Sequence, residues 1–340
     1  MKPPLLVIAG PTGVGKTAAA VALAARLPIE VVSADSRQVY RGMDIGTAKP
    51  TREERAAVPH HLIDVSDPDD RYHAARFARE ARAAIDAIRS RGRLPVVVGG
   101  TGLYIRALLR GLDEAPPADP VFRRELYALA AVESGALHVR LAREAPSVAD
   151  RLHPNDHVRI VRALELLRAG AAVGTAQRRW RDAPEMTDDA LYVGLTLPRD
   201  VLAARLRSRA ASMIAQGLKA EVERLLARGY DPSLPAMQGL GYREMALVLR
   251  GEIDEAEALR RMQRDTVRYA KRQWTWFARE SDIQWLDVQL CGGPEGVARM
   301  LAERMLRSGV SRVPPHPCLS PQAGRGCSER TGKETPPENR

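Results

Sequence analysis

The eight residues 10–17 have the residue types and spacing of a loop that binds phosphate. Glycines let successive backbone N–H groups point into one concavity, a lysine adds positive charge, and a threonine hydroxyl suits Mg²⁺. An apolar run, 5–9, precedes the loop, and a helical segment, 16–26, starts at it and adds the partial positive charge of a helix N-terminus. The expected phosphate ligands are Gly10, Pro11, Thr12, Gly13, Val14, Gly15, Lys16 and Thr17, with Thr17 also expected to bind the metal.

The common uses of such a loop, hydrolysis of ATP or GTP, require further motifs that are missing from the sequence. No N-K-x-D motif is present to read a guanine base, and the strand-like run 96–98 ends in glycine where a metal-linked acid would be expected. Asp64 is only a modest substitute. A small-molecule kinase stays possible, because such kinases carry an acid at the end of the second strand, where Asp35 stands.

Asp35 is the second chemical signal. It follows the apolar run 31–34, and the carboxyl end of that strand should lie at the same sheet edge as the phosphate-binding loop. Its carboxylate could be a general base for a substrate held by the loop. It could equally cap the following turn or bind Mg²⁺.

These residues must be positioned by an alternation of strands and helices. Amphipathic patterns such as 72–91, with Phe77 and Ile85 on one face, separate the apolar runs. This predicts a P-loop NTPase-like α/β fold, a doubly wound parallel sheet flanked by helices. The runs expected to be strands are 5–9, 31–34, 62–65, 96–98, 191–197 and 283–288.

The alternation stops between 111 and 184, where Ala, Leu, Glu and Arg dominate and proline-containing segments mark both ends. We expect a helical insertion domain there, and a catalytic core made of 1–110 and 185–308. Residues 309–340 have almost no apolar periodicity and are expected to be a disordered tail. Cys291, Cys318 and Cys327 lack the spacing of a zinc site, and we assign them no role.

The composition is that of a globular, basic protein. The chain has 340 residues, 45% hydrophobic and 28% charged, with a formal net charge of +10 and almost all of its 52 basic residues arginine. No segment is long and apolar enough for a signal or membrane span, so we expect a soluble, cytoplasmic protein without membrane contact. The charge permits an anionic partner or reflects a composition bias.

Clusters of arginine favour a nucleic-acid partner. On the helical segment 255–279, four arginines share one face with no acid on that stripe, opposite a face that includes Trp274 and Phe277. Such a stripe is either a solvated face or a contact surface for nucleic acid. A further basic stretch is expected at 178–181. The stripe consists of Arg261, Arg264, Arg268 and Arg272.

Seven segments in this order and spacing resemble the tRNA dimethylallyltransferase (isopentenyltransferase) family. They are GPTGVGKT, SADSRQVYRGMDIGTAKP, PHHLIDV, VVVGGTGLYIRALLRGL, HPNDHVRIVRALE, GLGYREM and RYAKRQWTWF. The resemblance extends over about residues 5 to 308. It implies transfer of a dimethylallyl group from dimethylallyl diphosphate to N6 of the adenosine next to the 3′ side of the anticodon, with Mg²⁺ as cofactor.

The resemblance also implies roles for single residues. Asp35 would be the general base, and the loop would hold the diphosphate leaving group. At least one of Arg205 and Arg209, one helical turn apart, would reach the diphosphate, although these arginines could also be solvated. Thr101 would meet the target nucleotide, and its alternative role is a cap for the helical segment 103–109.

The partner implied is the anticodon stem-loop of tRNA, from which the target adenosine must be flipped into a pocket. By similarity, 158–162 and 238–243 touch tRNA, and Arg123 reads the RNA near the target. The pattern at 237–241 departs slightly from the usual one, which weakens base contacts there. The expected tRNA-binding residues are Asp35, Ser36, Arg37, Gln38, Thr101, Arg123, Val158, Arg159, Ile160, Val161, Arg162, Gln238, Gly239, Leu240, Gly241, Tyr242, Arg243, Arg264 and Arg268.

Three alternatives remain beside this hypothesis. An adenylate isopentenyltransferase would share the loop and Asp35 but would need neither the insertion nor the segment 241–243. A small-molecule kinase would turn over ATP, and a non-catalytic RNA-binding protein would tolerate loss of Asp35. We expect the protein to act as a monomer.

Overall fold

The computed structural model describes residues 5–112, 116, 118–171, 173 and 190–308. The predicted tail, 309–340, and the basic stretch 178–181 lie outside the described residues, as do Cys318 and Cys327. The chain divides into two compact units, residues 1–108 with 188–340, and residues 109–187. We call them unit 1 and unit 2 and describe each by itself.

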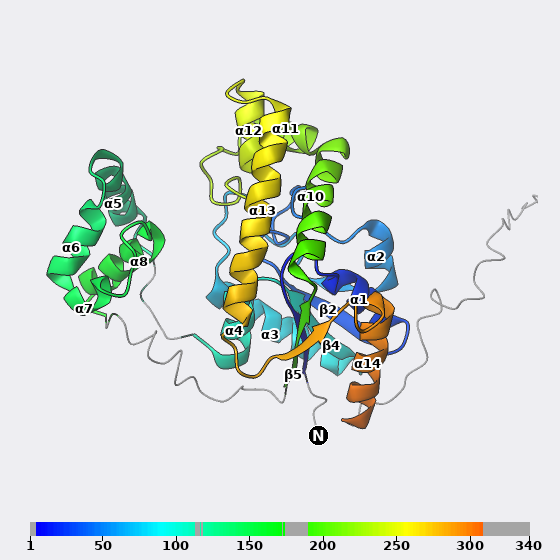
Figure 1. The fold of residues 1–340 in the computed structure, drawn as a ribbon. Coiled ribbons are helices and arrows are strands. Elements are labelled where there is room, and N and C mark those ends of the chain that lie inside the picture. Colours follow the sequence, from blue (N-terminus) through cyan, green and yellow to red (C-terminus); the bar gives the residue numbers. More distant parts are fainter. Residues whose placement is uncertain (1–4, 113–115, 117, 172, 174–189, 309–340) are drawn as a thin grey trace, which may run out of the picture. The chain divides into compact units, whose positions relative to one another are not determined.

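Unit 1 contains a six-stranded parallel sheet with the strand order β3-β2-β4-β1-β5-β6 (Figure 1). The parallel α/β architecture predicted from the alternation of strands and helices is confirmed. In the centre of the sheet, Ala9 is paired with Gly99 on one side and with Gly194 on the other. The strands are β1 (Leu5–Ala9), β2 (Ile29–Ala34), β3 (His60–His61), β4 (Leu94–Gly99), β5 (Ala190–Thr196) and β6 (Gln284–Asp287).

The third strand differs from the prediction. We expected a strand at 62–65, but the strand is His60–His61, and Leu62 and Asp64 have positive φ angles of 63° and 58°. This left-handed backbone cannot continue a strand. The Asp64 carboxylate instead accepts hydrogen bonds from Lys49 and Arg55, so its side chain is engaged in ion pairs.

Helices cover both faces of the sheet. On one face α1 (Lys16–Ala24) and α14 (Gly293–Arg307) pack together over strand residues such as Ile8, Val31 and Val98. On the other face α3 (Ala74–Ser90) packs on β2 and β4, and its Phe77 stacks on Tyr104 of α4 (Gly102–Arg110). The short α2 (Arg52–Ala57) begins at Thr51 with a capping box.

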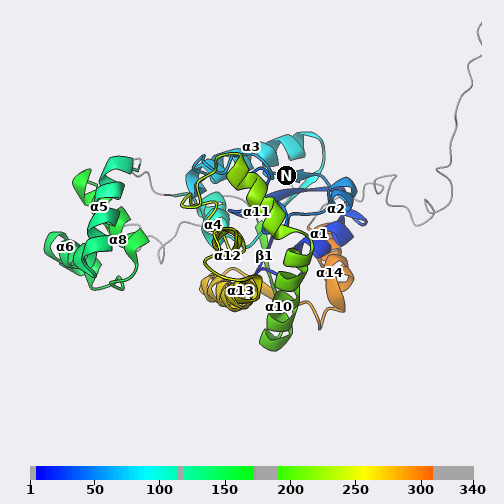
Figure 2. The ribbon, with the colours of Figure 1, turned by 90° about the horizontal axis from the view of Figure 1, so that it is seen from above.

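A second group of helices rises beyond the carboxyl edge of the sheet (Figures 1 and 2). The long helix α13 (Glu255–Phe277) lies beside α10 (Arg199–Ala215) and α12 (Tyr242–Leu249), and α11 (Leu218–Ala227) packs on α12. Of the helices in the described part of the chain, none has both the length and the apolar character needed to cross a membrane.

Unit 2 is helical and has its own apolar core, which includes Phe122, Leu141 and Ile160. Its α5 begins with Pro120 after the cap Asp119, whose carboxylate accepts the N–H groups of Val121 and Phe122. The helices are α5 (Pro120–Val132), α6 (Ala136–Glu144), α7 (Pro146–Ala149) and α8 (His157–Arg168).

Candidate active site

The site lies at the carboxyl edge of the sheet, where four strands deliver their following loops. Strand β1 leads to the phosphate-binding loop, β2 to Asp35, β4 to Gly100 and Thr101, and β5 to α10. All strands are parallel, so these loops meet at one edge. The topology therefore explains why residues far apart in sequence share one site.

The phosphate-binding loop has the geometry expected from its motif. Gly13 has a φ of +80°, and a Cβ there would lie 2.6 Å from a methyl carbon of Leu206 on α10. The positive φ therefore favours glycine here, and a side chain would also have to displace the Leu206 methyl group. Helix α1 starts at Lys16, whose Nζ donates to the carbonyl oxygens of Gly10 and Pro11, each at 2.9 Å.

Both candidate arginines of α10 contact this loop. Arg209 donates to the hydroxyl of Thr12 at 2.6 Å, and Arg205 donates to the carbonyl of Gly13 at 3.2 Å. Arg205 is exposed, whereas Arg209 is half-buried. The loop therefore carries two guanidinium groups in addition to Lys16, which is an arrangement suited to an anion with several charges.

Burial perturbs the cations at this loop. Burial, with a further contribution from Arg209, lowers the pKa of Lys16 to about 8, although the nearby Asp35 acts in the opposite direction. Burial and the neighbouring Arg205 lower the pKa of Arg209, again against the effect of Asp35. A bound anion would relieve this, because it stabilises the charged form of each group.

The Asp35 carboxylate faces the same space. Its Oδ1 accepts the backbone N–H groups of Arg37 at 2.8 Å and Gln38 at 3.3 Å, so the expected capping of the following turn does occur. Among the described residues no donor is bonded to Oδ2. One oxygen therefore fixes the carboxylate while the other remains available for a substrate.

Thr101 lies next to Asp35 in space. Its hydroxyl accepts the backbone N–H of Ser36 at 3.0 Å, while its carbonyl, not its hydroxyl, accepts the first N–H groups of α4, those of Tyr104 and Ile105. The alternative role as a side-chain cap for that helix is therefore wrong. The hydroxyl links the loop after β4 to the turn that holds Asp35.

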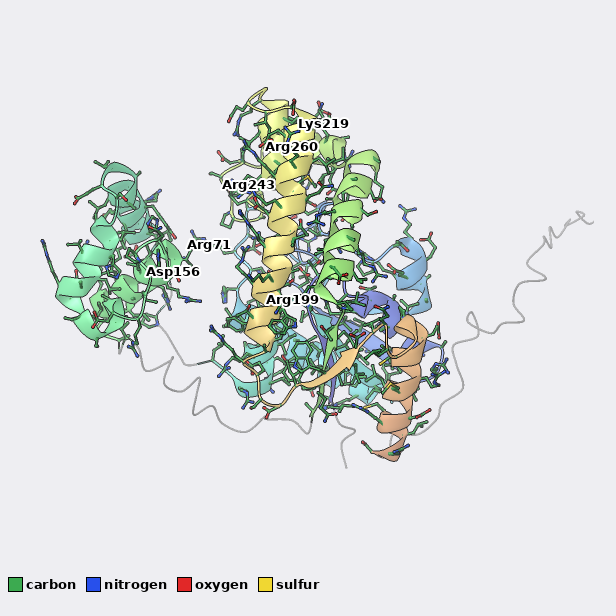
Figure 3. All side chains as sticks on the ribbon, viewed as in Figure 1. Arg71, Asp156, Arg199, Lys219, Arg243 and Arg260 are labelled. Carbon is green, nitrogen blue, oxygen red and sulfur yellow. The ribbon has the colours of Figure 1, made fainter. Side chains whose placement is uncertain are left out.

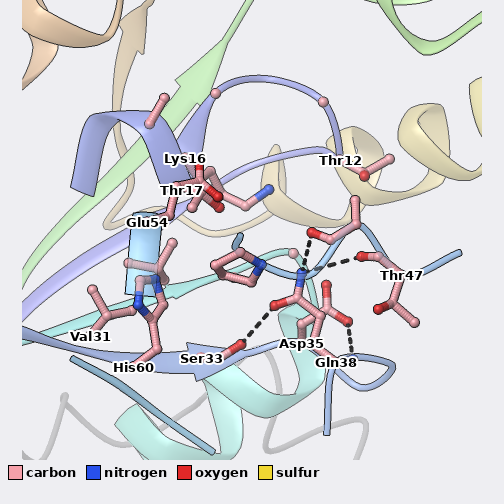
Figure 4. A pocket seen from close by; sticks show the side chains of 18 of the residues that line it. Thr12, Lys16, Thr17, Val31, Ser33, Asp35, Gln38, Thr47, Glu54 and His60 are labelled. Atoms are coloured by element: carbon pink, nitrogen blue, oxygen red, sulfur yellow. Dashed lines mark hydrogen bonds between the residues drawn. The ribbon is translucent and has the colours of Figure 1, made fainter. Parts of the chain in front are cut away.

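A cavity of about 270 Å³ is lined by the phosphate-binding loop, Asp35 and the two arginines of α10. Figure 4 shows Thr12, Lys16 and Thr17 on one side of it and Ser33, Asp35 and Gln38 on the other. Its lining also includes residues for which no role is predicted from the sequence. Among them are Val31, Ser33, Thr47, Ala48, Pro50, Glu54, His60 and Gln273.

Gln38 explains part of this lining. Its amide accepts the hydroxyl of Ser33 and donates to the carbonyls of Thr47 at 3.3 Å and Ala48 at 3.1 Å. Its side chain thus holds the 47–48 segment against β2, as a wall of the cavity. At the same wall, His60 contacts the carbonyl of Val58 at 2.8 Å, and burial lowers the pKa of its imidazole.

The segment 238–243 is only partly accessible. The side chain of Tyr242 is 1% exposed, and its hydroxyl donates to the buried Glu221 at 2.6 Å. Gly239 and Gly241 are buried as well, whereas Gln238 is exposed and Arg243 is half-buried. The prediction of tRNA contact is therefore too broad here. The side chain of Tyr242 points into the protein and links α12 to α11 through Glu221.

The arginine stripe of α13 is not free of acids, which corrects our expectation. Asp265 accepts hydrogen bonds from Arg264 at 2.8 Å and Arg268 at 3.4 Å, and Glu257 accepts one from Arg261. Asp265 is the next residue after Arg264, and Glu257 lies one helical turn before Arg261, so both carboxylates reach the stripe. Arg264 and Arg268 are nevertheless exposed at this face.

One side chain of α13 is more exposed than its sequence pattern predicts. Trp274, expected on the core face of α13, is 38% exposed and lies under the guanidinium of Arg199, 5.0 Å from the ring centre. Figure 3 shows Arg243 and Arg260 toward the upper end of this group and Arg199 near the lower end of α13.

In unit 2 the candidate RNA contacts are of two kinds. Ile160 and Val161 belong to the apolar core, so their side chains are not available to RNA, and a contact at these two residues would have to involve the backbone. Val158 and Arg159 are exposed. In addition, Arg123 and Arg162 are half-buried and both donate to Glu165, Arg123 at 2.6 and 2.7 Å and Arg162 at 3.3 Å.

Comparison with known proteins identifies the family. The IPP transferase family model matches residues 38–280, and the isopentenyl transferase model matches residues 3–64. A tRNA dimethylallyltransferase from Anaeromyxobacter dehalogenans is 50% identical over 301 residues, 88% of this chain and 99% of that protein. A second such enzyme, tRNA dimethylallyltransferase 2 of Geotalea uraniireducens, is 51% identical over 284 residues, 83% of this chain and 92% of that one.

Solved structures agree with this assignment. The tRNA isopentenylpyrophosphate transferase of Bacillus halodurans matches with a TM-score of 0.66 and 39% identity, over 91% of this chain and 98% of that one. A eukaryotic dimethylallyltransferase acting on tRNA matches with a TM-score of 0.73 and 26% identity, over 91% and 81% of the two chains. By sequence over most of its length and by fold, the chain belongs to the IPP transferase family.

Proposed function

We propose that this protein transfers the dimethylallyl group of dimethylallyl diphosphate to N6 of the adenosine on the 3′ side of the anticodon in tRNA. The observation that carries the proposal is one cavity, lined by the phosphate-binding loop, Arg205, Arg209 and Asp35, in a member of this family. Relatives about 50% identical over most of this chain are named tRNA dimethylallyltransferases.

In the chemical step the adenine N6 attacks C1 of the dimethylallyl group. The N6–C1 bond forms as the C1–O bond breaks, and diphosphate leaves with the electron pair. The N6 lone pair is delocalised into the ring, so the attack benefits from a base that accepts the amino proton. Asp35 takes that proton on Oδ2, while Oδ1 stays bonded to the turn that follows.

The leaving diphosphate gains negative charge, and fixed donors at that position lower the barrier. Lys16 and the backbone of the loop supply part of this stabilisation, and Arg205 and Arg209 supply the rest from α10. Thr101 positions the acceptor base by its hydroxyl, next to the turn that carries Asp35.

The donor set also fits Mg²⁺. The cavity offers the hydroxyls of Thr17 and Ser33, which are hard oxygen ligands. Mg²⁺ usually keeps water and substrate phosphate oxygens among its ligands. Thr17 would hold the ion, and the ion would neutralise charge on the diphosphate.

The acceptor side requires an RNA surface. A base in an anticodon loop must be unstacked, at a cost of about a few kcal/mol, and contacts to phosphates and bases must compensate. The exposed Arg264 and Arg268 of α13, and Val158 and Arg159 of unit 2, are the proposed contacts. The proposed partner is tRNA, bound by a monomer in the cytoplasm.

One labelling assay tests the function. Purified protein with Mg²⁺ and radiolabelled dimethylallyl diphosphate is expected to label an anticodon stem-loop with adenosine at the 3′ side of the anticodon, and not a stem-loop with guanosine there. AMP and ATP serve as competing acceptors. Equal labelling of free AMP would refute the tRNA assignment and favour an adenylate isopentenyltransferase.

A further inference from the structure

The side chain of Gln273 joins two loops of the site. Gln273 lies on α13, is 7% exposed, and has both ends of its amide occupied. Its Oε1 accepts the backbone N–H of Thr12 at 2.8 Å, and its Nε2 donates to the carbonyl of Gly100, also at 2.8 Å. One side chain from the last third of the chain thus bridges the phosphate-binding loop and the loop after β4.

The two residues that this amide contacts belong to different parts of the site. Thr12 is bonded through its hydroxyl to Arg209, on the side that holds the diphosphate. Gly100 precedes Thr101, whose hydroxyl is bonded to the N–H of Ser36, next to Asp35. Gln273 therefore stands between the group that binds the leaving group and the group that accepts the proton.

The packing around the amide is tight. A Cβ on Gly100 would lie 2.4 Å from Nε2 of Gln273 and 3.3 Å from the carbonyl oxygen of Gly10, so any side chain at residue 100 would displace the amide. The bridge also requires a donor and an acceptor on the same planar group. Glutamine meets this need, whereas ionised glutamate lacks the donor and methionine lacks both strong partners.

We propose that Gln273 is a positioning residue that fixes the distance between the diphosphate-binding loop and the general base. The proposal rests on the proposed function. Gln273 acts through Thr12 and Gly100, without a proton transfer of its own. Because misplacement of reacting groups by about 1 Å can cost about 10²-fold in rate, loss of the bridge acts mainly on kcat.

The first test replaces Gln273 by a side chain of similar length without the amide. Gln273→Met is expected to lower kcat at saturating tRNA and dimethylallyl diphosphate by about 10- to 100-fold, with the Kd for tRNA and the Tm close to wild type. Thr275→Ala is the matched control, because this exposed hydroxyl on the same helix donates to the carbonyl of Lys271 within its own helix. The control is expected to retain the wild-type kcat.

A pH profile separates positioning from a general loss of structure. An ionised glutamate in Gln273→Glu would repel the carbonyl of Gly100, whereas the protonated form can again donate to it. The kcat of Gln273→Glu, taken relative to wild type at each pH, is therefore expected to rise as the pH falls. The same ratio for Gln273→Met is expected to stay flat.

The outcomes distinguish the two proposals. An inactive wild-type protein would contradict the proposed function, whereas an active wild type with unchanged kcat in Gln273→Met would overturn the role of Gln273. If Gln273→Met does not fold, the glutamate variant decides, because a pH-independent ratio to wild type would equally overturn it.

Discussion

The backbone N–H of Arg37 donates to Oδ1 of Asp35 at 2.8 Å, which fixes one oxygen of the carboxylate and leaves the other facing the cavity. This relationship allows a sharper substitution than alanine. Asparagine keeps an acceptor oxygen for the N–H groups of Arg37 and Gln38 and removes only the basic oxygen.

Asp35→Asn is expected to lower the single-turnover rate of prenyl transfer by about 10²-fold or more, because the amino proton loses its acceptor. The Kd for the anticodon stem-loop should stay near the wild-type value. Rapid-quench assays and a filter-binding titration measure the two quantities. A single-turnover rate equal to that of the wild type would remove Asp35 from the chemical step.

The two arginines of α10 should contribute unequally to the binding of dimethylallyl diphosphate. Arg209 is half-buried and donates to Thr12, so Arg209→Met is expected to raise the KM for dimethylallyl diphosphate by about 10- to 100-fold, in line with about 1.5–3 kcal/mol for a charged hydrogen bond. Arg205→Met is expected to have a smaller effect, because Arg205 is exposed. Steady-state kinetics at saturating tRNA measure both, and the reverse order would contradict the assignment.

Lys16 should give the donor site a pH dependence. Its pKa is lowered to about 8 in the free protein, so its charge is present below pH 8 and lost as the pH rises above it. Bound diphosphate favours the charged form. The affinity for inorganic pyrophosphate should therefore exceed that of Lys16→Met by about 10- to 100-fold below pH 8.

This advantage of the wild-type protein should shrink as the pH rises above 8. Calorimetric titrations of both proteins at each pH cancel the ionisation of pyrophosphate itself. An affinity ratio that stays constant from pH 7 to 10 would show that Lys16 does not titrate in this range.

The paired arginines of α13 predict a moderate salt effect. Replacing Arg264 and Arg268 by alanine should weaken tRNA binding and reduce the slope of log K against log [salt] by about 1 to 2, since each phosphate contact contributes about 0.7–0.9. Asp265→Asn should have the opposite effect, because Asp265 neutralises both arginines. Unchanged slopes in both variants would leave the stripe as a solvated face.

The buried pair of Tyr242 and Glu221 predicts a loss of stability. The Glu221 carboxylate accepts the Tyr242 hydroxyl as well as the N–H groups of Ile45 and Gly46, and burial together with Glu221 raises the pKa of Tyr242. Tyr242→Phe should lower the free energy of unfolding by about 1–3 kcal/mol in urea titrations. Tyr230→Phe, at a half-buried site, is the control and should change it by less than about 0.5 kcal/mol.

Much of the fold was predictable because its signals are local. The phosphate-binding loop, the strand before Asp35 and the helix from Ala74 to Ser90 follow from short patterns of apolar residues and glycine. The end of that strand also predicted that Asp35 would meet the loop. By contrast, the prediction of a strand at 62–65 was wrong, because Leu62 and Asp64 adopt left-handed backbone angles. The identities of these two residues do not predict such angles.

Parts of the site were not predictable for a different reason. Gln273 lies on the buried face of α13 and was hidden behind the arginines that dominate the pattern of that helix. Its importance comes from Thr12 and Gly100, which are distant in sequence. Gln38 and Tyr242 were predicted only as RNA contacts. Their hydrogen bonds to the 47–48 segment and to Glu221 join separate segments, and a single sequence contains no pattern for such contacts.

The sheet register has a consequence for how the chain is made. Leu5 of β1 pairs with Ala190 of β5, so one side of the central strand has no native neighbour until the polypeptide beyond residue 190 has left the ribosome. Strand β1 is thus completed only after unit 2 has been translated. During translation, this open edge of β1 exposes unpaired backbone N–H and C=O groups with which other chains could pair.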